Sequence, residues 1–165
     1  PFARHALLSA VAAILCGCAH NIPDSPRAST FLGIPVLGDR SLLASLERAY
    51  AILPEEDQRY VFDNGPDRIE LVDHGSGALH TAPPVLRLAP HTIYFSRTWL
   101  AGTLVHQACH IAYAAEGLTA LDEERACLAR QLQTAEKIRA PECETARITS
   151  ADGSHIEAPP QAQYW

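Results

Sequence analysis

The amino-acid sequence predicts a single α+β domain, in which one N-terminal helix precedes a small antiparallel or mixed sheet and then a helical hairpin. Apolar residues recur at helical spacing over residues 41–53, and Pro54 ends that pattern. The middle of the chain holds short apolar segments separated by turn residues, and the last third holds two longer helical patterns. A length of 165 residues suits one domain.

Composition and charge narrow the class of protein. Hydrophobic residues make up 47% of the chain, which is enough for a buried core. The formal net charge is −6, and no run of five like charges occurs. Because binding through a basic patch needs clustered positive charge, the sequence argues against a nucleic-acid partner.

Residues 1–17 are predicted to be a lipoprotein signal peptide. Arg4 precedes an apolar run over residues 6–15, about half as long as a bilayer-spanning helix. The run is followed by a Cys-Gly-Cys sequence that resembles the bacterial lipobox. That resemblance implies a membrane anchor through lipid on Cys18, and with Ala19 next it implies the outer membrane, facing the periplasm. The alternative for this segment is a buried N-terminal helix.

The rest of the chain divides into three expected parts. Residues 18–38, broken by Pro, Gly, Ser and Asn, are predicted to be a tether, residues 39–148 the folded domain and residues 149–165 a loosely packed tail. Short strands are expected within the domain at residues 59–62, 68–72, 78–81, 85–88 and 92–95.

Two helices are predicted in the last third, over residues 98–116 and from Thr119 to about residue 139. Gly117 suits the C-terminal cap of the first helix. Thr119 followed by Asp122 is typical of a capping box at the start of the second. A tight turn between them makes an antiparallel hairpin.

His106 and His110 stand four residues apart on the first of these helices, so both imidazoles project from one face. Two such histidines can reach one metal ion, and a catalytic zinc site adds a third protein ligand. At a rise of ~1.5 Å per residue, His110 lies about 10 Å and Glu123 about 6 Å from the turn, a difference that a glutamate side chain can cover. The alternative is a chance pair of hydrogen-bonded histidines, since the chain has eight.

Residues 103–111 read TLVHQACHI, and residues 123–126 read EERA. This resembles the gluzincin pattern H-E-x-x-H followed by E-x-x-A, which small bacterial secreted proteins and lipoproteins carry. The resemblance implies a zincin-like fold, a peptide substrate and an edge strand at residues 92–95 that aligns it. It also implies a Zn²⁺ cofactor bound by His106, His110 and Glu123.

Glu123, rather than Glu124, takes the ligand position in this resemblance because it stands three residues before Ala126. The related metzincin pattern does not fit, because Tyr113 stands at its glycine and Glu116 at its third ligand. Tyr113 is a candidate donor of a hydrogen bond to an oxyanion, with a place in the core as the alternative.

Gln107 occupies the position of the glutamate that acts as general base in this class. Its amide can hydrogen-bond a water molecule but cannot take a proton, so hydrolysis is expected to fall about 10²–10⁴-fold or more. Neither Glu116 nor Glu124 is expected to replace the base, because their side chains project in other directions. Gln107 has three explanations: a natural pseudo-enzyme, an introduced change or a sequence error.

Cys109 and Cys127 each lie eight residues from the predicted turn, so they are level on the hairpin. A disulfide between them is one hypothesis, and two small buried thiols are the other.

The function expected from these patterns is that of an envelope-anchored zinc-binding protein of metalloendopeptidase ancestry, with impaired peptide hydrolysis. The alternative is a non-enzymatic lipoprotein that binds a partner peptide or serves as an envelope scaffold.

Overall fold

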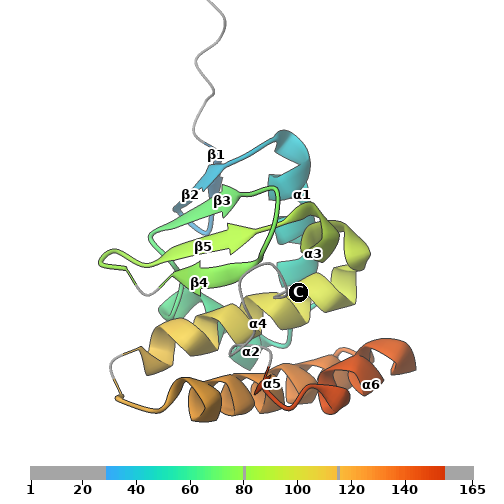
Figure 1. The fold of residues 1–165 in the computed structure, drawn as a ribbon. Helices are drawn as coiled ribbons and strands as arrows, with labels where there is room; N and C mark the ends of the chain where they lie inside the picture. The colour runs from blue at the N-terminus through green and yellow to red at the C-terminus, as the bar shows by residue number, and fades with distance from the viewer. Residues whose placement is uncertain (1–28, 80, 115, 155–165) are drawn as a thin grey trace, which may run out of the picture.

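The computed structural model describes residues 29–79, 81–114 and 116–154. It confirms the α+β class, because a five-stranded mixed sheet and six helices form in these residues (Figure 1). The predicted signal peptide, the predicted lipidation site Cys18 and most of the tether lie outside the described residues, as do the last residues of the tail. None of the helices in the described part of the chain is long and apolar enough to cross a bilayer.

The sheet combines parallel and antiparallel strands, which span Ser29–Phe31 (β1), Ile34–Leu37 (β2), Arg68–Leu71 (β3), Gly77–Leu79 (β4) and Val85–Leu88 (β5). They lie in the order β1-β2-β3-β5-β4. β1 pairs with β2, and β4 with β5, in antiparallel fashion, whereas β3 pairs in parallel with both β2 and β5. β4 is therefore an outer strand.

The prediction that residues 18–38 form a tether is wrong for its last part, because β1 and β2 make a hairpin there. Gly33 lies in the turn with a φ of +83°, a conformation that glycine adopts without steric cost. Phe31 and Val36 are each 3% exposed in the main core. The Pro and Gly residues of this stretch interrupt short strands that pack, so the folded domain begins before residue 39.

Helix α1 (Arg40–Tyr50) forms close to its predicted place. The side chain of Asp39 caps it by accepting a hydrogen bond from a backbone N–H of the first turn, at 2.9 Å. Residues 59–62, predicted as a strand, instead lie in helix α2 (Glu55–Asp63). Pro54 followed by three acidic residues is a favourable helix start, and it outweighs the short apolar segment after it.

Residues 92–95, predicted as the edge strand, also form a helix. Helix α3 (Pro90–Phe95) has proline in its first turn, where the fixed φ of that residue suits a helix. β1 and β4 are the outer strands of the sheet instead, and β4 contacts helix α4 (Arg97–Tyr113). Figure 1 shows β4 as the strand next to α4.

Helices α4 and α5 (Ala120–Lys137) form the predicted hairpin at the lower side of the fold in Figure 1. The hydroxyl of Thr119 caps α5 as predicted, by accepting a hydrogen bond from the backbone N–H of Asp122 at 3.1 Å. α4 ends at Tyr113 rather than at residue 116, so Gly117, with a φ of +69°, belongs to the loop between the helices.

A sixth helix, α6 (Glu142–Ser150), includes the first two residues of the predicted tail. Glu144 on α6 is 3% exposed and accepts hydrogen bonds from Ser96 at 2.6 Å and from Thr98 at 2.8 Å. Because Ser96 is also the N-terminal cap of α4, this carboxylate fastens α6 to the start of α4.

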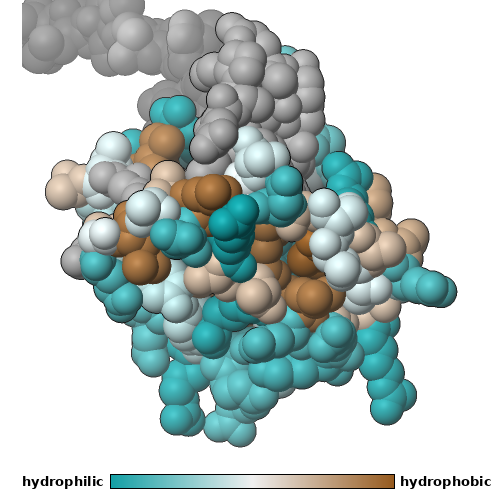
Figure 2. All heavy atoms as spheres, turned by 60° about the horizontal axis from the view of Figure 1, so that its bottom comes forward, coloured by the Kyte–Doolittle hydropathy of each residue, from teal (hydrophilic) through white to brown (hydrophobic). Residues whose placement is uncertain are grey.

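Helix α4 is the buried centre of the fold. Residues 99–109 of α4 are all buried. The main core joins α4 to α1 and the sheet, and a second cluster of buried residues joins it to α5 and α6, through Trp99, Leu128, Ala135 and Ile148. Turned so that the α5–α6 side comes forward, the surface is largely hydrophilic across the lower half of the view, and hydrophobic patches lie above it (Figure 2).

Candidate metal centre

Two histidines of α4 and one glutamate of α5 converge inside the hairpin. His106 and Glu124 are buried, at 7% and 3% exposure, and His110 is partly buried. One ligand atom from each of the three residues lies within 4.8 Å of the others. His106 and His110 face α5 together because they are one helical turn apart.

The spacing of these atoms suits a small ion. The Nε2 atoms of His106 and His110 are 3.0 Å apart, and Nε2 of His110 is 2.9 Å from Oε2 of Glu124. Nε2 of His106 is 3.6 Å from Oε1 of Glu124. Ligand bonds of about 2.0–2.1 Å in a tetrahedron place donor atoms about 3.3 Å apart. The group therefore has nearly the required donor spacing.

The ligand prediction needs one correction, because Glu124 and not Glu123 belongs to this group. Oε1 of Glu123 lies 2.6 Å from Nδ1 of His110, on the far side of the imidazole from Nε2. A carboxylate at Nδ1 fixes the tautomer and the direction of the ring, and so leaves Nε2 for a metal. Glu123 and Glu124 are about 100° apart around α5, which gives them separate positions on the same histidine.

The electrostatics of the group favour the charged forms of His110 and Glu124. Burial by itself lowers the pKa of His110, but hydrogen bonds to Glu124 and Glu123 outweigh it and raise that pKa above its ordinary value. Burial also raises the pKa of Glu124, but hydrogen bonds and charge from His106 and His110 outweigh it and hold that pKa well below its ordinary range. A divalent cation competes with protons for these ligand atoms.

The second nitrogen of His106 distinguishes it from His110. Nδ1 of His106 is buried and has no hydrogen-bond partner among the residues that the structure describes.

The donor set of two imidazoles and one carboxylate is used by zinc hydrolases and by mononuclear iron(II) enzymes. The residues thus fit a divalent transition metal, with His106, His110 and Glu124 as its protein ligands.

Gln107 lies outside the three-residue group. Its side chain is 8% exposed and lines a small apolar pocket with residues of α2, α4 and the sheet, among them Val61, Ile69 and Leu104. Oε1 of Gln107 is buried there and has no hydrogen-bond partner in the described part of the chain. Tyr113, the oxyanion candidate, ends α4 half-buried and close enough to Tyr60 of α2 to contribute to the raised pKa of that phenol, which burial mainly causes.

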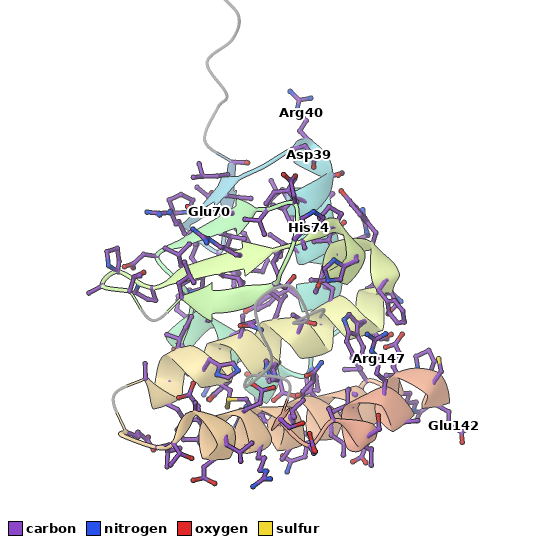
Figure 3. The ribbon with its side chains drawn as sticks, in the orientation of Figure 1. Asp39, Arg40, Glu70, His74, Glu142 and Arg147 are labelled. Carbon is purple, nitrogen blue, oxygen red and sulfur yellow. A yellow bond between two sulfur atoms is a disulfide. The ribbon has the colours of Figure 1, made fainter. Side chains whose placement is uncertain are left out.

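A disulfide joins Cys109 of α4 to Cys127 of α5, which confirms the disulfide hypothesis. Both residues are buried, at 1% and 0% exposure, and their Cα atoms are 5.4 Å apart. The bond between the two sulfur atoms is visible between α4 and α5 in Figure 3. It ties together the two helices that supply the metal ligands.

The buried carboxylate of Asp57 contacts the C-terminal half of α5. Asp57 of α2 is 1% exposed and accepts a hydrogen bond from Thr134 at 3.1 Å and from Lys137 at 3.3 Å. Arg130 approaches the same carboxylate to 3.8 Å and stacks its guanidinium over the ring of Tyr60. The sequence offered no motif for this contact, because its partners are about 80 residues apart.

The remaining described histidines lie elsewhere. His74 is exposed between β3 and β4, as Figure 3 shows, and His91 is exposed on α3. Partial desolvation and the nearby His74 and Arg147 lower the pKa of His91. His80 and His155 lie outside the described residues.

Fold and site together define an α+β protein with a buried His₂–carboxylate group that suits a metal ion. Comparisons with protein-family models, with curated proteins and with solved structures found no match for the chain.

Proposed function

We propose that the chain is a zinc-binding protein of the bacterial envelope, descended from metalloendopeptidases and impaired in peptide hydrolysis. The observation that carries the proposal is the convergence of His106, His110 and Glu124 inside the α4–α5 hairpin. Zinc is proposed because the sequence pattern resembles that of zinc peptidases, and because two imidazoles and one carboxylate are a donor set that zinc hydrolases use. The envelope location rests on the lipobox-like sequence that ends at Cys18.

The residues of the site have separate tasks in this proposal. His106, His110 and Glu124 hold the ion, and Glu123 orients His110 through Nδ1. Zinc bound there supplies a Lewis acid and a water molecule of lowered pKa. Gln107 stands at the sequence position of the general base, but its amide cannot take a proton and its side chain lines the apolar pocket rather than the metal group.

Hydrolysis is impaired because the carboxylates near the histidines are already engaged. Glu124 contacts both imidazoles, and Glu123 is bonded to His110. Without a general base the rate falls by about 10²–10⁴-fold.

A second candidate function is the binding of a partner peptide along β4 without hydrolysis. β4 is an outer strand that pairs with β5 on one side, and it contacts α4. An outer strand offers backbone N–H and C=O groups to which an extended peptide adds as a further strand. A peptide bound in this way would lie alongside the helix that carries His106 and His110.

The test compares the wild-type chain with Gln107→Glu and with a control that combines Gln107→Glu and His110→Ala. Zinc content is measured in each protein, and cleavage of a mixed peptide library is followed by mass spectrometry. Zinc in the first two proteins, with cleavage only by Gln107→Glu, supports the proposal. Zinc without cleavage in either favours the peptide-binding candidate, and absence of bound zinc from both removes the metal function.

A further inference from the structure

The Cys109–Cys127 disulfide and the metal group occupy the same stretch of the helical hairpin. Cys109 directly precedes His110 on α4, and Cys127 follows Glu124 by three residues on α5. Because α4 supplies two ligands and α5 supplies the third, the donor spacing depends on how firmly this part of α5 is held against α4.

The N-terminal part of α5, before Leu128, lies outside the two hydrophobic clusters of the described residues. The contacts of Asp57 likewise reach only the second half of the helix, at Arg130, Thr134 and Lys137. On its first half, Arg125 donates a hydrogen bond to the backbone of Asp152, at 3.1 Å.

Between α4 and the part of α5 before Leu128, the structure gives contacts from two carboxylates and the disulfide. Glu123 and Glu124 contact His110, and the disulfide joins the helices one turn further along. The loop that precedes α5 is exposed at Gly117 and Leu118. The disulfide occupies a position at which two packed helices usually have apolar side chains in contact.

We infer that this disulfide controls the metal centre: when it is intact it holds Glu124 at ligand distance from the histidines, and its reduction lowers the affinity for zinc. This inference rests on the proposed zinc-binding function. The mechanism is preorganisation, since ligands held in place lose less conformational freedom on binding the ion. Residues that support metal ligands typically contribute about 10–100-fold to metal affinity.

The redox step is a two-electron reduction of the Cys109–Cys127 bond. A dithiol reductant attacks one sulfur, its second thiolate then displaces the mixed disulfide, and its two thiol protons pass to the released cysteines while the reductant becomes its own disulfide. Both cysteines are buried, so the reductant reaches them only when the hairpin opens locally. By thermodynamic linkage, bound zinc must make the disulfide harder to reduce to the same extent that reduction weakens zinc binding.

The experiment uses the full chain with Cys16→Ser, Cys18→Ser and Cys143→Ser, so that Cys109 and Cys127 are its remaining cysteines; among the described residues Cys143 is exposed and free. Zinc affinity is measured by chelator competition in the oxidised protein, in the protein reduced with a phosphine and freed of reductant, and in a Cys109→Ala, Cys127→Ala variant. Circular dichroism sets a temperature at which all three are equally folded. We expect the reduced and double-alanine proteins to bind zinc about 10–100-fold more weakly than the oxidised protein.

Three results overturn the inference. Equal or tighter zinc binding by the reduced protein does so while leaving zinc binding itself intact. A sulfur-to-cobalt charge-transfer band in the Co²⁺-loaded reduced protein does so as well, because the thiols would then be ligands. Absence of zinc binding in the oxidised protein removes the proposed function together with the inference.

A second readout needs no stable reduced protein. The fraction of reduced protein at equilibrium in a glutathione redox buffer is measured by mass tagging with and without saturating zinc. A smaller reduced fraction in the presence of zinc supports the inference, and an equal fraction overturns it.

Discussion

Oε1 of Glu123 lies 2.6 Å from Nδ1 of His110 at the centre of the α4–α5 hairpin. This contact turns Nε2 of the imidazole toward His106 and Glu124. The two neighbouring glutamates therefore have different roles, because Glu124 shares the metal-binding space and Glu123 supports a histidine from behind.

Replacement of each glutamate separates these roles. Glu123→Gln should lower zinc affinity by about 10–100-fold, since the amide still accepts a hydrogen bond but carries no charge. Glu124→Gln should lower it by a larger factor, because an anionic ligand is lost. Competition with a chromogenic chelator measures both affinities. A larger loss for Glu123→Gln would restore the assignment that the E-x-x-A resemblance implies.

Zinc should stabilise the fold, because the ligands lie on two helices that separate on unfolding. A ligand at 100 times its dissociation constant adds about 2.7 kcal/mol to the free energy of unfolding. Urea unfolding of the same preparation with zinc and with a chelator measures this increment. The His106→Ala variant is the control, and it should show no difference between the two conditions. Equal midpoints for the wild type would count against a metal bound in the hairpin.

Asp57→Ala should lower the free energy of unfolding by about 2–4 kcal/mol, because it leaves Thr134 and Lys137 without their buried acceptor. Glu55→Ala is the matched control on the same helix. Its pair with Arg59 is exposed, at 88% and 72% side-chain exposure, and should contribute about 0.5 kcal/mol or less. Urea unfolding of both variants tests the difference. Equal effects would show that the buried acid does not secure α5.

Phe31→Ala tests whether the β1–β2 hairpin belongs to the folded domain. Phe31 is 3% exposed and meets the ring of Tyr50 edge-on, with centroids 5.6 Å apart. Its truncation should cost about 3–4 kcal/mol, whereas Thr30→Ala on the exposed face of the same strand should change stability by about 0.5 kcal/mol. A negligible effect of Phe31→Ala on the unfolding midpoint would show that the β1–β2 segment is not part of the folded domain.

The sequence predicted those features of the site that depend on local spacing. The histidine pair follows from the helical repeat, the Thr119 cap from its neighbour Asp122, and the level positions of Cys109 and Cys127 from an equal distance to the turn. The choice between Glu123 and Glu124 could not be made in this way. Both face the hairpin, and the tertiary packing of α5 decides which carboxylate meets Nε2.

The two segments that were predicted as strands but form helices share one physical cause. Residues 59–62 and 92–95 are short apolar segments, for which strand and helix patterns are hard to tell apart. In each case a preceding proline starts a helix. The β1–β2 hairpin was predicted as tether because its turn residues break any regular pattern. Its strands pack on α1, and such a long-range contact cannot be predicted from local sequence.

The most direct test of the central claim is a count of the zinc ions retained by the full chain after gel filtration. The account predicts one zinc per chain for the wild type and none for a His106→Ala, His110→Ala variant that keeps the same circular dichroism spectrum. A wild type without zinc, or a double variant that retains it, would contradict the assignment of these two histidines and Glu124 as a metal centre.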